Sequence, residues 1–333
     1  MTKVGIIGIG YWGKNHLRSY NKLKDEGLID EIVVCDINEK ALMEIKKRDG
    51  FEIAKDWNSL LQDQDLDMVS IITPSPSHYE ISKKFMEAGK DVLVEKPMAM
   101  TVEECDDLIK VSQETGSGLM VGHIFRFHPG VLELRNRIER GEFGEILNIK
   151  IRRQTLISPR KDMGVMLALG IHEVDLTCFL LNDKTPDKIF ADMNSYYTNN
   201  EEMALIIQKF GKTTAYSIES WIDPSEGKLR DLYLIGTQGS AKLNFSIPNK
   251  INLINSYLKP RNNSKNTTYE VVNGGDFEVV IDYKEPLLEE LRHFVLESKN
   301  KKKYQANAAI GRRAVYLILK AIESNKLNKF LEL

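Results

Sequence analysis

Near its N-terminus the chain reads Lys3-Val4-Gly5-Ile6-Ile7-Gly8-Ile9-Gly10-Tyr11-Trp12-Gly13. The apolar run over residues 3–9 is typical of a buried strand, and the glycines that follow have the spacing G-x-G-x-x-G. Residues 11–24 then carry apolar side chains three or four positions apart, as in a helix. A strand, a glycine-rich turn and a helix in this order predict the first unit of a doubly wound parallel sheet.

Each glycine of this turn has a mechanical reason. Gly8 permits the tight turn, Gly10 lets the backbone approach a pyrophosphate, and Gly13 lets the helix and strand pack closely. The helix N-terminus supplies unpaired N–H groups for the phosphates. Asp36 ends the next strand-like run, and a carboxylate there accepts hydrogen bonds from the adenosine ribose and repels a 2′-phosphate. We therefore predict bound NAD rather than NADP. The predicted contacts are Gly8, Gly10, Tyr11, Trp12, Gly13 and Asp36.

The rest of the first third repeats this alternation. Short runs rich in valine and isoleucine, typical of strands covered on both faces, alternate with helical patterns such as residues 77–88. The strand-like runs are 3–9, 31–36, 68–73, 91–94 and 118–122. They predict an α/β fold for residues 1–122, an NAD-binding Rossmann domain with a doubly wound parallel sheet.

The pattern changes after Gly122. Residues 129–140 are predicted as a helix, and 145–153 alternate apolar and polar residues like a half-exposed strand. Further strand-like runs are 188–197, 202–210, 213–221, 230–235, 240–247 and 250–257. Polar residues 260–268 are predicted as an exposed hairpin loop, and helices are predicted over 285–298 and 307–325. We expect a second, α+β domain over 123–333, with a large, mainly antiparallel sheet, for substrate binding and oligomerisation.

Several strands of this second sheet carry apolar residues on both faces. Leu232 and Leu234, for example, alternate with Tyr233 and Ile235. Helices can cover one face, and a second copy of the chain is the simplest cover for the other. We therefore predict a homodimer or homotetramer. An ordinary sheet with scattered surface hydrophobes is the alternative.

The composition of the 333 residues excludes several functional classes. A net charge of −2 gives no positive field for nucleic acid. Cys35, Cys105 and Cys178 form no C-x-x-C pair, which suits a reducing compartment and predicts no metal site. The N-terminus has no signal-peptide pattern, and no apolar stretch approaches the about 18 residues of a spanning helix. We expect a cytoplasmic protein that binds neither nucleic acid nor membrane.

Glu95-Lys96-Pro97 follows the fifth strand-like run. The carboxyl ends of strands in a doubly wound sheet line the ligand crevice. A lysine there, beside the positive nicotinamide, could have a lowered pKa and exchange a proton with a hydroxyl. A surface lysine that merely follows a strand is the alternative.

These features resemble the Gfo/Idh/MocA oxidoreductases, related to glucose–fructose oxidoreductase and inositol dehydrogenase, over nearly the whole chain. Glu95-Lys96-Pro97 after an N-terminal glycine fingerprint is the most specific element. The other matching segments are Ile72-Thr73-Pro74 followed by His78, Gly122-His123-Ile124-Phe125-Arg126-Phe127-His128-Pro129, Asp162-Met163-Gly164-Val165, Gly170-Ile171-His172-Glu173-Val174-Asp175 and Tyr283-Lys284-Glu285-Pro286-Leu287.

The resemblance implies hydride transfer between NAD and a secondary alcohol of a sugar, cyclitol or nucleotide sugar. It implies that Lys96 lies beside the nicotinamide and that His172 reaches the reacting hydroxyl from the second domain. These two are the predicted catalytic residues. Further cofactor contacts are predicted at Thr73, Pro74, His78, Glu95 and Lys96, and substrate contacts at Arg126, Arg152 and Asp175.

The chemistry of histidine agrees with this role. Oxidation of a secondary alcohol needs a base with a pKa near neutrality, which histidine usually supplies. His172 lies in an apolar helical pattern with Asp175 about one turn later. A buried histidine satisfied by Asp175 is the alternative. The prediction requires Lys96 and His172 to converge over one face of the nicotinamide.

Ala168 departs from the family pattern. Many relatives carry an aspartate four residues before this histidine, and a methyl group cannot accept a proton or orient an imidazole. Either Lys96 and His172 act without the acid, or the reaction has changed or been lost. The alternative function is therefore a dinucleotide-binding regulator without turnover. A tightly held cofactor that cycles between two sugars is a third possibility.

Three other residues stay open at this point. Arg126 and Arg152 could contact an anionic substrate such as a nucleotide sugar, or they could form structural salt bridges. His128 stands where asparagine is frequent in the family, and the sequence offers no reason for it.

Overall fold

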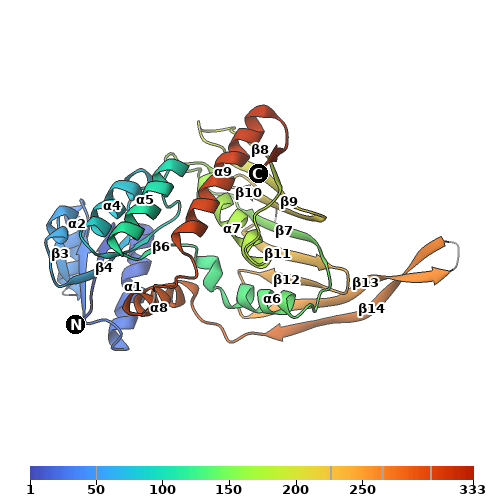
Figure 1. The fold of residues 1–333 in the computed structure, drawn as a ribbon, viewed down its shortest axis with the longest axis horizontal. Coiled ribbons are helices and arrows are strands. Elements are labelled where there is room, and N and C mark those ends of the chain that lie inside the picture. The colour runs from blue at the N-terminus through green and yellow to red at the C-terminus, as the bar shows by residue number, and fades with distance from the viewer. Residues whose placement is uncertain (50, 226, 264–265, 301) are drawn as a thin grey trace. The chain divides into compact units, whose positions relative to one another are not determined.

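The computed structural model describes residues 1–49, 51–225, 227–263, 266–300 and 302–333 (Figure 1). The chain forms two compact units. The first comprises Met1–Phe127 and Glu285–Tyr316, and the second comprises His128–Lys284 and Leu317–Leu333. The segment Glu285–Tyr316 thus packs with the N-terminal part of the chain, whereas the predicted division at residue 122 groups it with the C-terminal part.

The first unit contains a six-stranded sheet with the order β3-β2-β1-β4-β5-β6. Every neighbouring pair is parallel, which confirms the predicted doubly wound Rossmann sheet. Its elements are β1 (Lys3–Ile7), α1 (Tyr11–Asp25), β2 (Glu31–Cys35), α2 (Glu39–Asp49), β3 (Glu52–Ala54), α3 (Trp57–Leu61), β4 (Leu66–Ile71), η1 (Ser75–Ser77), α4 (His78–Glu87), β5 (Asp91–Val94), α5 (Val102–Thr115), β6 (Leu119–Val121), η2 (Ile124–Phe127) and α8 (Pro286–Lys299).

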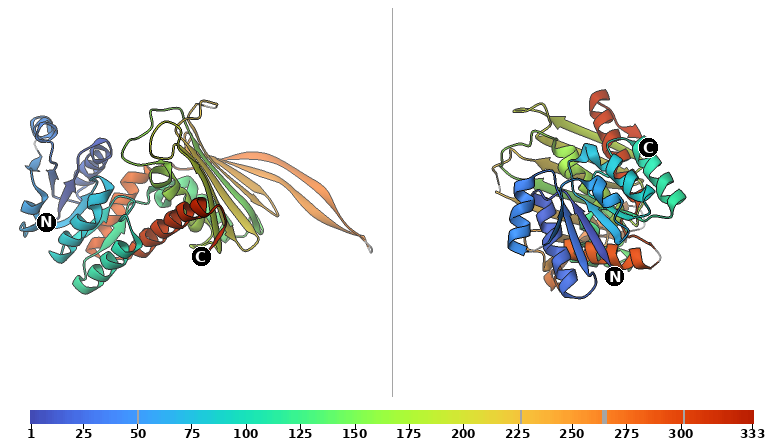
Figure 2. Two further views of the ribbon diagram at one scale, coloured as in Figure 1. Left: turned by 90° about the horizontal axis from the view of Figure 1, so that it is seen from above. Right: turned by 90° about the vertical axis from the view of Figure 1, so that its left-hand side faces the viewer.

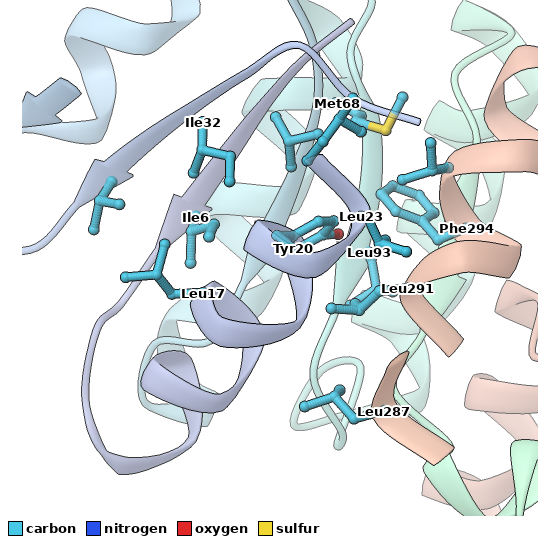
Figure 3. Close-up of a cluster of buried hydrophobic side chains, with 14 of the residues drawn as sticks. Ile6, Leu17, Tyr20, Leu23, Ile32, Met68, Leu93, Leu287, Leu291 and Phe294 are labelled. Carbon is cyan, nitrogen blue, oxygen red and sulfur yellow. The ribbon is translucent and has the colours of Figure 1, made fainter. Parts of the chain in front are cut away.

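A buried cluster holds α1 and α8 against this sheet (Figure 3). Tyr20 of α1 and Leu291 and Phe294 of α8 are fully buried in it. The Tyr20 hydroxyl contacts the Ser70 hydroxyl of β4 at 2.7 Å, so its one polar atom is satisfied inside the core. The apolar spacing of α1 in the sequence therefore marks the face that packs on the sheet and on α8.

The second unit is built on a nine-stranded sheet with the order β14-β13-β12-β11-β7-β10-β9-β8-β15. Its β7 and β10 pair in parallel and the other described pairs are antiparallel, which confirms the predicted mainly antiparallel sheet. Its elements are α6 (Pro129–Glu139), β7 (Ile146–Gln154), the π-helical turn η3 (Met166–Gly170), α7 (Ile171–Leu180), β8 (Lys188–Asn194), β9 (Met203–Phe210), β10 (Thr213–Ser220), β11 (Leu229–Gly236), β12 (Ser240–Asn244), β13 (Lys250–Asn263), β14 (Asn266–Val280) and β15 (Leu331–Glu332). Helix α9 (Ala308–Leu327) begins in the first unit and ends in the second.

The predicted hairpin loop at residues 260–268 is wrong. Strand β13 extends to Asn263 and β14 begins at Asn266, and the two pair as a long ribbon, with Pro260 opposite Tyr269 and Asn263 opposite Asn266 (Figure 2). Residues 264–265 lie outside the described chain. The prediction failed because polar composition was taken for a loop, whereas pairing with the partner strand makes the described part of this stretch β-structure. The strand-like runs of the sequence also omit β14 and the three residues of β3.

The described residues contain no helix long and apolar enough to cross a membrane.

Candidate active site

The glycine turn after β1 has the geometry that its sequence predicts. Gly8 has a φ of +95°, and a Cβ there would lie 2.6 Å from the carbonyl oxygen of Ile72. A Cβ on Gly13 would lie 2.0 Å from the carbonyl oxygen of Gly8, so the turn closes onto α1 only with glycine. A Cβ on Gly10, by contrast, would meet nothing within 4 Å. Gly8 and Gly13 are thus required by packing, and Gly10 faces open space.

The N-terminus of α1 is suited to a pyrophosphate. Its N-cap is Gly10, which offers no side chain to the N–H groups of the first turn, and no acidic residue lies in that turn. Such uncapped N–H groups form an anion site with the positive end of the helix dipole. Tyr11, the first helical residue, is 88% exposed. This turn therefore fits the phosphates of a dinucleotide.

Asp36 lies directly after β2, half-buried beside the glycine turn. Its Oδ2 accepts a hydrogen bond from the Ile9 N–H at 2.6 Å, and its Oδ1 accepts one from the Asn38 N–H at 2.7 Å. An ionised carboxylate can accept about four hydrogen bonds, so both oxygens keep capacity for ribose hydroxyls. The side chain joins β2 to the glycine turn as well as marking the predicted ribose site.

Glu95 connects the glycine turn to the predicted catalytic lysine. Its Oε1 accepts hydrogen bonds from Trp12 Nε1 at 2.7 Å and from His16 Nε2 at 3.0 Å. Its Oε2 accepts the backbone N–H of Lys96 at 3.3 Å. A Cβ on Gly122 would lie 2.9 Å from Glu95 Oε1, so that glycine leaves room for the carboxylate.

The ionisation of Glu95 follows from these contacts. Burial alone would raise the pKa of this carboxyl, but His16, Lys96 and Trp12 outweigh burial and hold the pKa below its ordinary value. Glu290 of α8 is fully buried nearby, and burial together with the charge of Glu95 raises its pKa well above the ordinary value. Glu95 is therefore ionised, and Glu290 keeps its proton.

Lys96 stands at the carboxyl end of β5, directly before a buried stretch of the chain. The Lys96–Pro97 peptide bond is cis, and Met98 and Ala99 are buried. The N–H of Met100 donates to Glu104 Oε2 at 2.9 Å. Lys96 itself is half-buried. Since all strands of this sheet are parallel, Gly8, Asp36 and Lys96 lie at the same edge.

Three other predicted cofactor residues, Thr73, Pro74 and His78, follow β4. Thr73 is half-buried, and its hydroxyl accepts a hydrogen bond from Ser77 Oγ at 2.7 Å. Pro74 is exposed and is the N-cap of the 3₁₀ turn η1. His78 is only 1% exposed, and both of its ring nitrogens face backbone carbonyl oxygens.

In the second unit, His172 is the second residue of α7 and is half-buried. Asp175 is buried on the same helix. Ala168 lies in the π-helical turn η3 that leads into α7, so the turn before His172 is wider than an α-helical turn. Lys96 and His172 belong to different compact units, and their convergence stays a prediction.

Beneath α7 lies a buried charged cluster that the sequence analysis missed. Arg153 of β7 pairs with Glu173 of α7 at 2.7 Å, and Glu219 of β10 is the register partner of Arg153. Both carboxyls are at most 1% exposed. Burial and then the charge of Glu173 raise the pKa of Glu219 to about 8, although Ser217 and Arg153 lower it. Glu173 is paired with Arg153, and the Glu219 carboxyl keeps its proton at neutral pH.

The two arginines that were left open have protein partners. Arg152 makes a bidentate ion pair with buried Asp231, with Nε and a terminal nitrogen 2.9 and 2.6 Å from its oxygens. Arg126 is 1% exposed and donates to the carbonyl of Gln305 at 3.4 Å. The ion pair of Arg152 fits the alternative of a structural salt bridge. Contact of either arginine with substrate stays a prediction.

His128 has a clear local role. It is the N-cap of α6, and its Nδ1 accepts a hydrogen bond from the Gly130 N–H at 3.1 Å. Burial lowers the pKa of His128 to about 4, so the ring stays neutral and can accept. A neutral imidazole thus does the capping that an asparagine side chain does elsewhere.

Comparison with known proteins identifies the family. Residues 2–123 match the family model described as "Oxidoreductase family, NAD-binding Rossmann fold", of the Gfo/Idh/MocA type. Residues 131–242 match the model of the Gfo/Idh/MocA C-terminal domain. The chain belongs to the Gfo/Idh/MocA oxidoreductase family. Membership confirms the predicted oxidoreductase, its Rossmann fold and NAD as its cofactor.

Several Gfo/Idh/MocA relatives are similar in sequence. Inositol 2-dehydrogenase from Salmonella paratyphi B is 27% identical over 249 residues, which cover 72% of this chain and 73% of the relative. UDP-N-acetylglucosamine 3-dehydrogenase from Acidithiobacillus ferrooxidans is 31% identical over 204 residues, 61% of each chain. Both are named dehydrogenases, and neither favours the alternative of a regulator without turnover.

Solved Gfo/Idh/MocA structures share the whole fold. A structure of UDP-N-acetylglucosamine 3-dehydrogenase from A. ferrooxidans has a TM-score of 0.82 at 23% identity and covers 98% of both chains. Levoglucosan dehydrogenase in complex with NADH and levoglucosan has a TM-score of 0.83 at 19% identity and covers 99% of both chains. At these identities the structures show the common architecture.

Proposed function

We propose that this protein transfers hydride between NAD and a secondary alcohol of a sugar, cyclitol or nucleotide sugar. One observation carries the proposal. The Glu95 carboxylate ties the backbone of Lys96 to the first turn of α1, the turn that fits the dinucleotide phosphates. The proposed proton-transferring group and the proposed cofactor site are thus joined at one edge of the sheet. The related dehydrogenases named for inositol and UDP-N-acetylglucosamine support the substrate class.

The proposed roles divide between the two units. Bound NAD supplies the hydride acceptor. Lys96 from the first unit and His172 from the second hold the alcohol hydroxyl, and one of them accepts its proton, or donates it in the reverse direction. Thr73, Pro74 and Glu95 border the nicotinamide. This assignment treats residues 1–122 as the cofactor domain and 123–333 as the substrate domain.

An assay with purified protein tests the function. The protein is incubated with NAD and, in turn, myo-inositol, UDP-N-acetylglucosamine and levoglucosan, while absorbance of the reduced cofactor is followed. We expect reduction with at least one member of a panel of this kind. Tight binding of NAD without reduction by any sugar, cyclitol or nucleotide sugar would favour the regulator. Retained NAD(H), detected by mass spectrometry of the protein as isolated, would instead indicate a cofactor that cycles in place.

The preference for NAD gives a separate prediction. Replacing Asp36 with asparagine removes the charge that repels a 2′-phosphate and keeps an oxygen for the Ile9 N–H. The ratio of the Kd values for NADP and NAD should fall by about tenfold or more, since 1.4 kcal/mol corresponds to a factor of ten. Isothermal titration calorimetry measures both values. Asp65→Asn, at an exposed turn, is the matched control.

We also infer that the chain is a homodimer or homotetramer in the cytoplasm. Leu258 and Val271 are paired across the β13–β14 hairpin, and they are 60% and 75% exposed. Burial of such a pair between two copies would remove this apolar surface from water. The three cysteines are buried and free, as expected in a reducing compartment. Light scattering after size exclusion measures the oligomeric state, and a monomer would refute this inference.

A further inference from the structure

His78 is a buried histidine that contacts the segments after β4 and β5. It is the first residue of α4 and is only 1% exposed. Its Nδ1 lies 2.8 Å from the carbonyl oxygen of Pro97, and its Nε2 lies 2.8 Å from the carbonyl oxygen of Thr73. A single ring therefore spans the segment after β5 and the segment after β4. Neither ring nitrogen is left to point at a ligand.

The two carbonyls belong to functionally distinct segments. Pro97 is the residue directly after Lys96, and Thr73 is a predicted cofactor contact. On the other side of Lys96, the carboxylate of Glu95 holds the lysine's own N–H. The backbone that carries the lysine is thus held on both sides by buried side chains. Without the ring, the Pro97 side of this support would be lost.

We propose that His78 is a positioning residue for Lys96, fixing the lysine backbone through a hydrogen bond from its Nδ1–H to the Pro97 carbonyl. This inference rests on the proposed role of Lys96 in proton transfer. It assigns to His78 a role through the lysine, in place of the direct cofactor contact expected from the sequence. With its backbone fixed, the Lys96 side chain extends from a constant position at the edge of the sheet.

The number of protons on the His78 ring decides how many hydrogen bonds it can donate. Both partners are acceptors, so a neutral ring donates to only one of them, whereas an imidazolium donates to both. Burial lowers the pKa of His78, and the two carbonyls and the charge of Glu95 only partly offset this, while Lys96 lowers it further. The ring is therefore neutral at neutral pH. The proposal requires its one proton to be on Nδ1.

Two variants, His78→Asn and His78→Gln, test the proposal by placing an amide N–H₂ near one ring nitrogen or the other. An asparagine side chain places its N–H₂ near the position of Nδ1, whereas a glutamine places it near Nε2. We expect His78→Gln to lower kcat, by up to about 10²-fold, because small displacements of a catalytic group are costly. His78→Asn should retain several-fold more turnover than His78→Gln. The Kd for NAD should change little in either variant.

Two measurements are independent of turnover. Ring ¹⁵N shifts identify the tautomer of His78 among the six histidines of the chain, with the His78→Asn spectrum giving the assignment. Hydrogen exchange at the Lys96 and Met98 amides should be faster in His78→Gln than in the wild type. The tautomer and the amide exchange rates still test the hydrogen bond from His78 to the Pro97 carbonyl if Lys96→Met retains turnover and the proposed function fails.

Three results would overturn the inference. The first is a ring protonated on Nε2 alone at neutral pH. The second is equal kcat and equal amide exchange in the wild type and both amide variants. The third is a large loss of NAD affinity in both variants, which would return His78 to a direct role in cofactor binding.

Discussion

Replacing Lys96 with methionine should lower kcat by about 10²–10⁴-fold, the usual contribution of general acid–base catalysis. The methionine keeps the length and apolar stem of the side chain but cannot transfer a proton. The Kd for NAD should stay within a few-fold of the wild-type value, because the proposed phosphate site consists of Gly10 and the uncapped first turn of α1. Steady-state kinetics and calorimetry measure the two quantities on the same preparations.

Two further variants separate chemistry from structure. Lys96→Arg keeps the positive charge, but arginine does not lose its proton in the accessible pH range, so turnover should be lost here as well. Lys84→Met, at an exposed position on α4, should behave as the wild type. If Lys96→Met loses NAD binding in parallel with kcat, the lysine belongs to the cofactor site and its proposed catalytic role is wrong.

Replacing Glu219 with glutamine should stabilise the protein in neutral and mildly alkaline solution. The folded-state pKa of Glu219 is raised from 4.5 to about 8, so the folded chain holds a proton that the unfolded chain releases. In the wild type this stability is fully present below about pH 4.5 and is lost as the pH rises toward 8. Glutamine imitates the protonated carboxyl at every pH and removes this loss.

The size of this effect follows from proton linkage. One proton released on unfolding changes the free energy of unfolding by about 1.4 kcal/mol per pH unit. The stability difference between Glu219→Gln and the wild type should therefore grow by about that amount per unit between pH 5 and 7.5. Urea unfolding at several pH values measures it. Glu145→Gln, at an exposed position near β7, is the control. A difference that is independent of pH would show that Glu219 is ionised in the folded protein.

The sequence predicted the fold best where turn glycines and the spacing of apolar residues specify the same local structure. Gly8, Gly10 and Gly13 were each assigned a mechanical role, and the structure shows Gly8 and Gly13 in close packing and Gly10 in open space. The helix predicted over 129–140 is α6, which begins at Pro129 and ends at Glu139. In both cases the information is local, because a turn or a helix is specified by neighbouring residues.

The parts that were missed depend on contacts distant in sequence. His16 and Glu95 are 79 positions apart, and no local sequence pattern predicts their hydrogen bond. One signal was available, because Trp12 and His16 are four residues apart and share a face of α1. Arg153, Glu173 and Glu219 come from two strands and a helix, so the cluster exists only once the sheet has formed. The long β14 was missed because its pairing with β13, rather than its composition, makes it a strand.

The Glu95 carboxylate has a consequence for engineering this enzyme. It accepts hydrogen bonds from the first turn of α1 and from the backbone of Lys96 at once, so the cofactor turn and the lysine cannot drift independently. Attempts to widen cofactor choice by rebuilding the turn around Trp12 would also shift the lysine and reduce turnover. Asp36, which follows β2, makes no contact with Glu95, but its carboxylate accepts the Ile9 N–H of the same glycine turn. A substitution that keeps this acceptor, such as Asp36→Asn, is therefore the better route to altered cofactor preference.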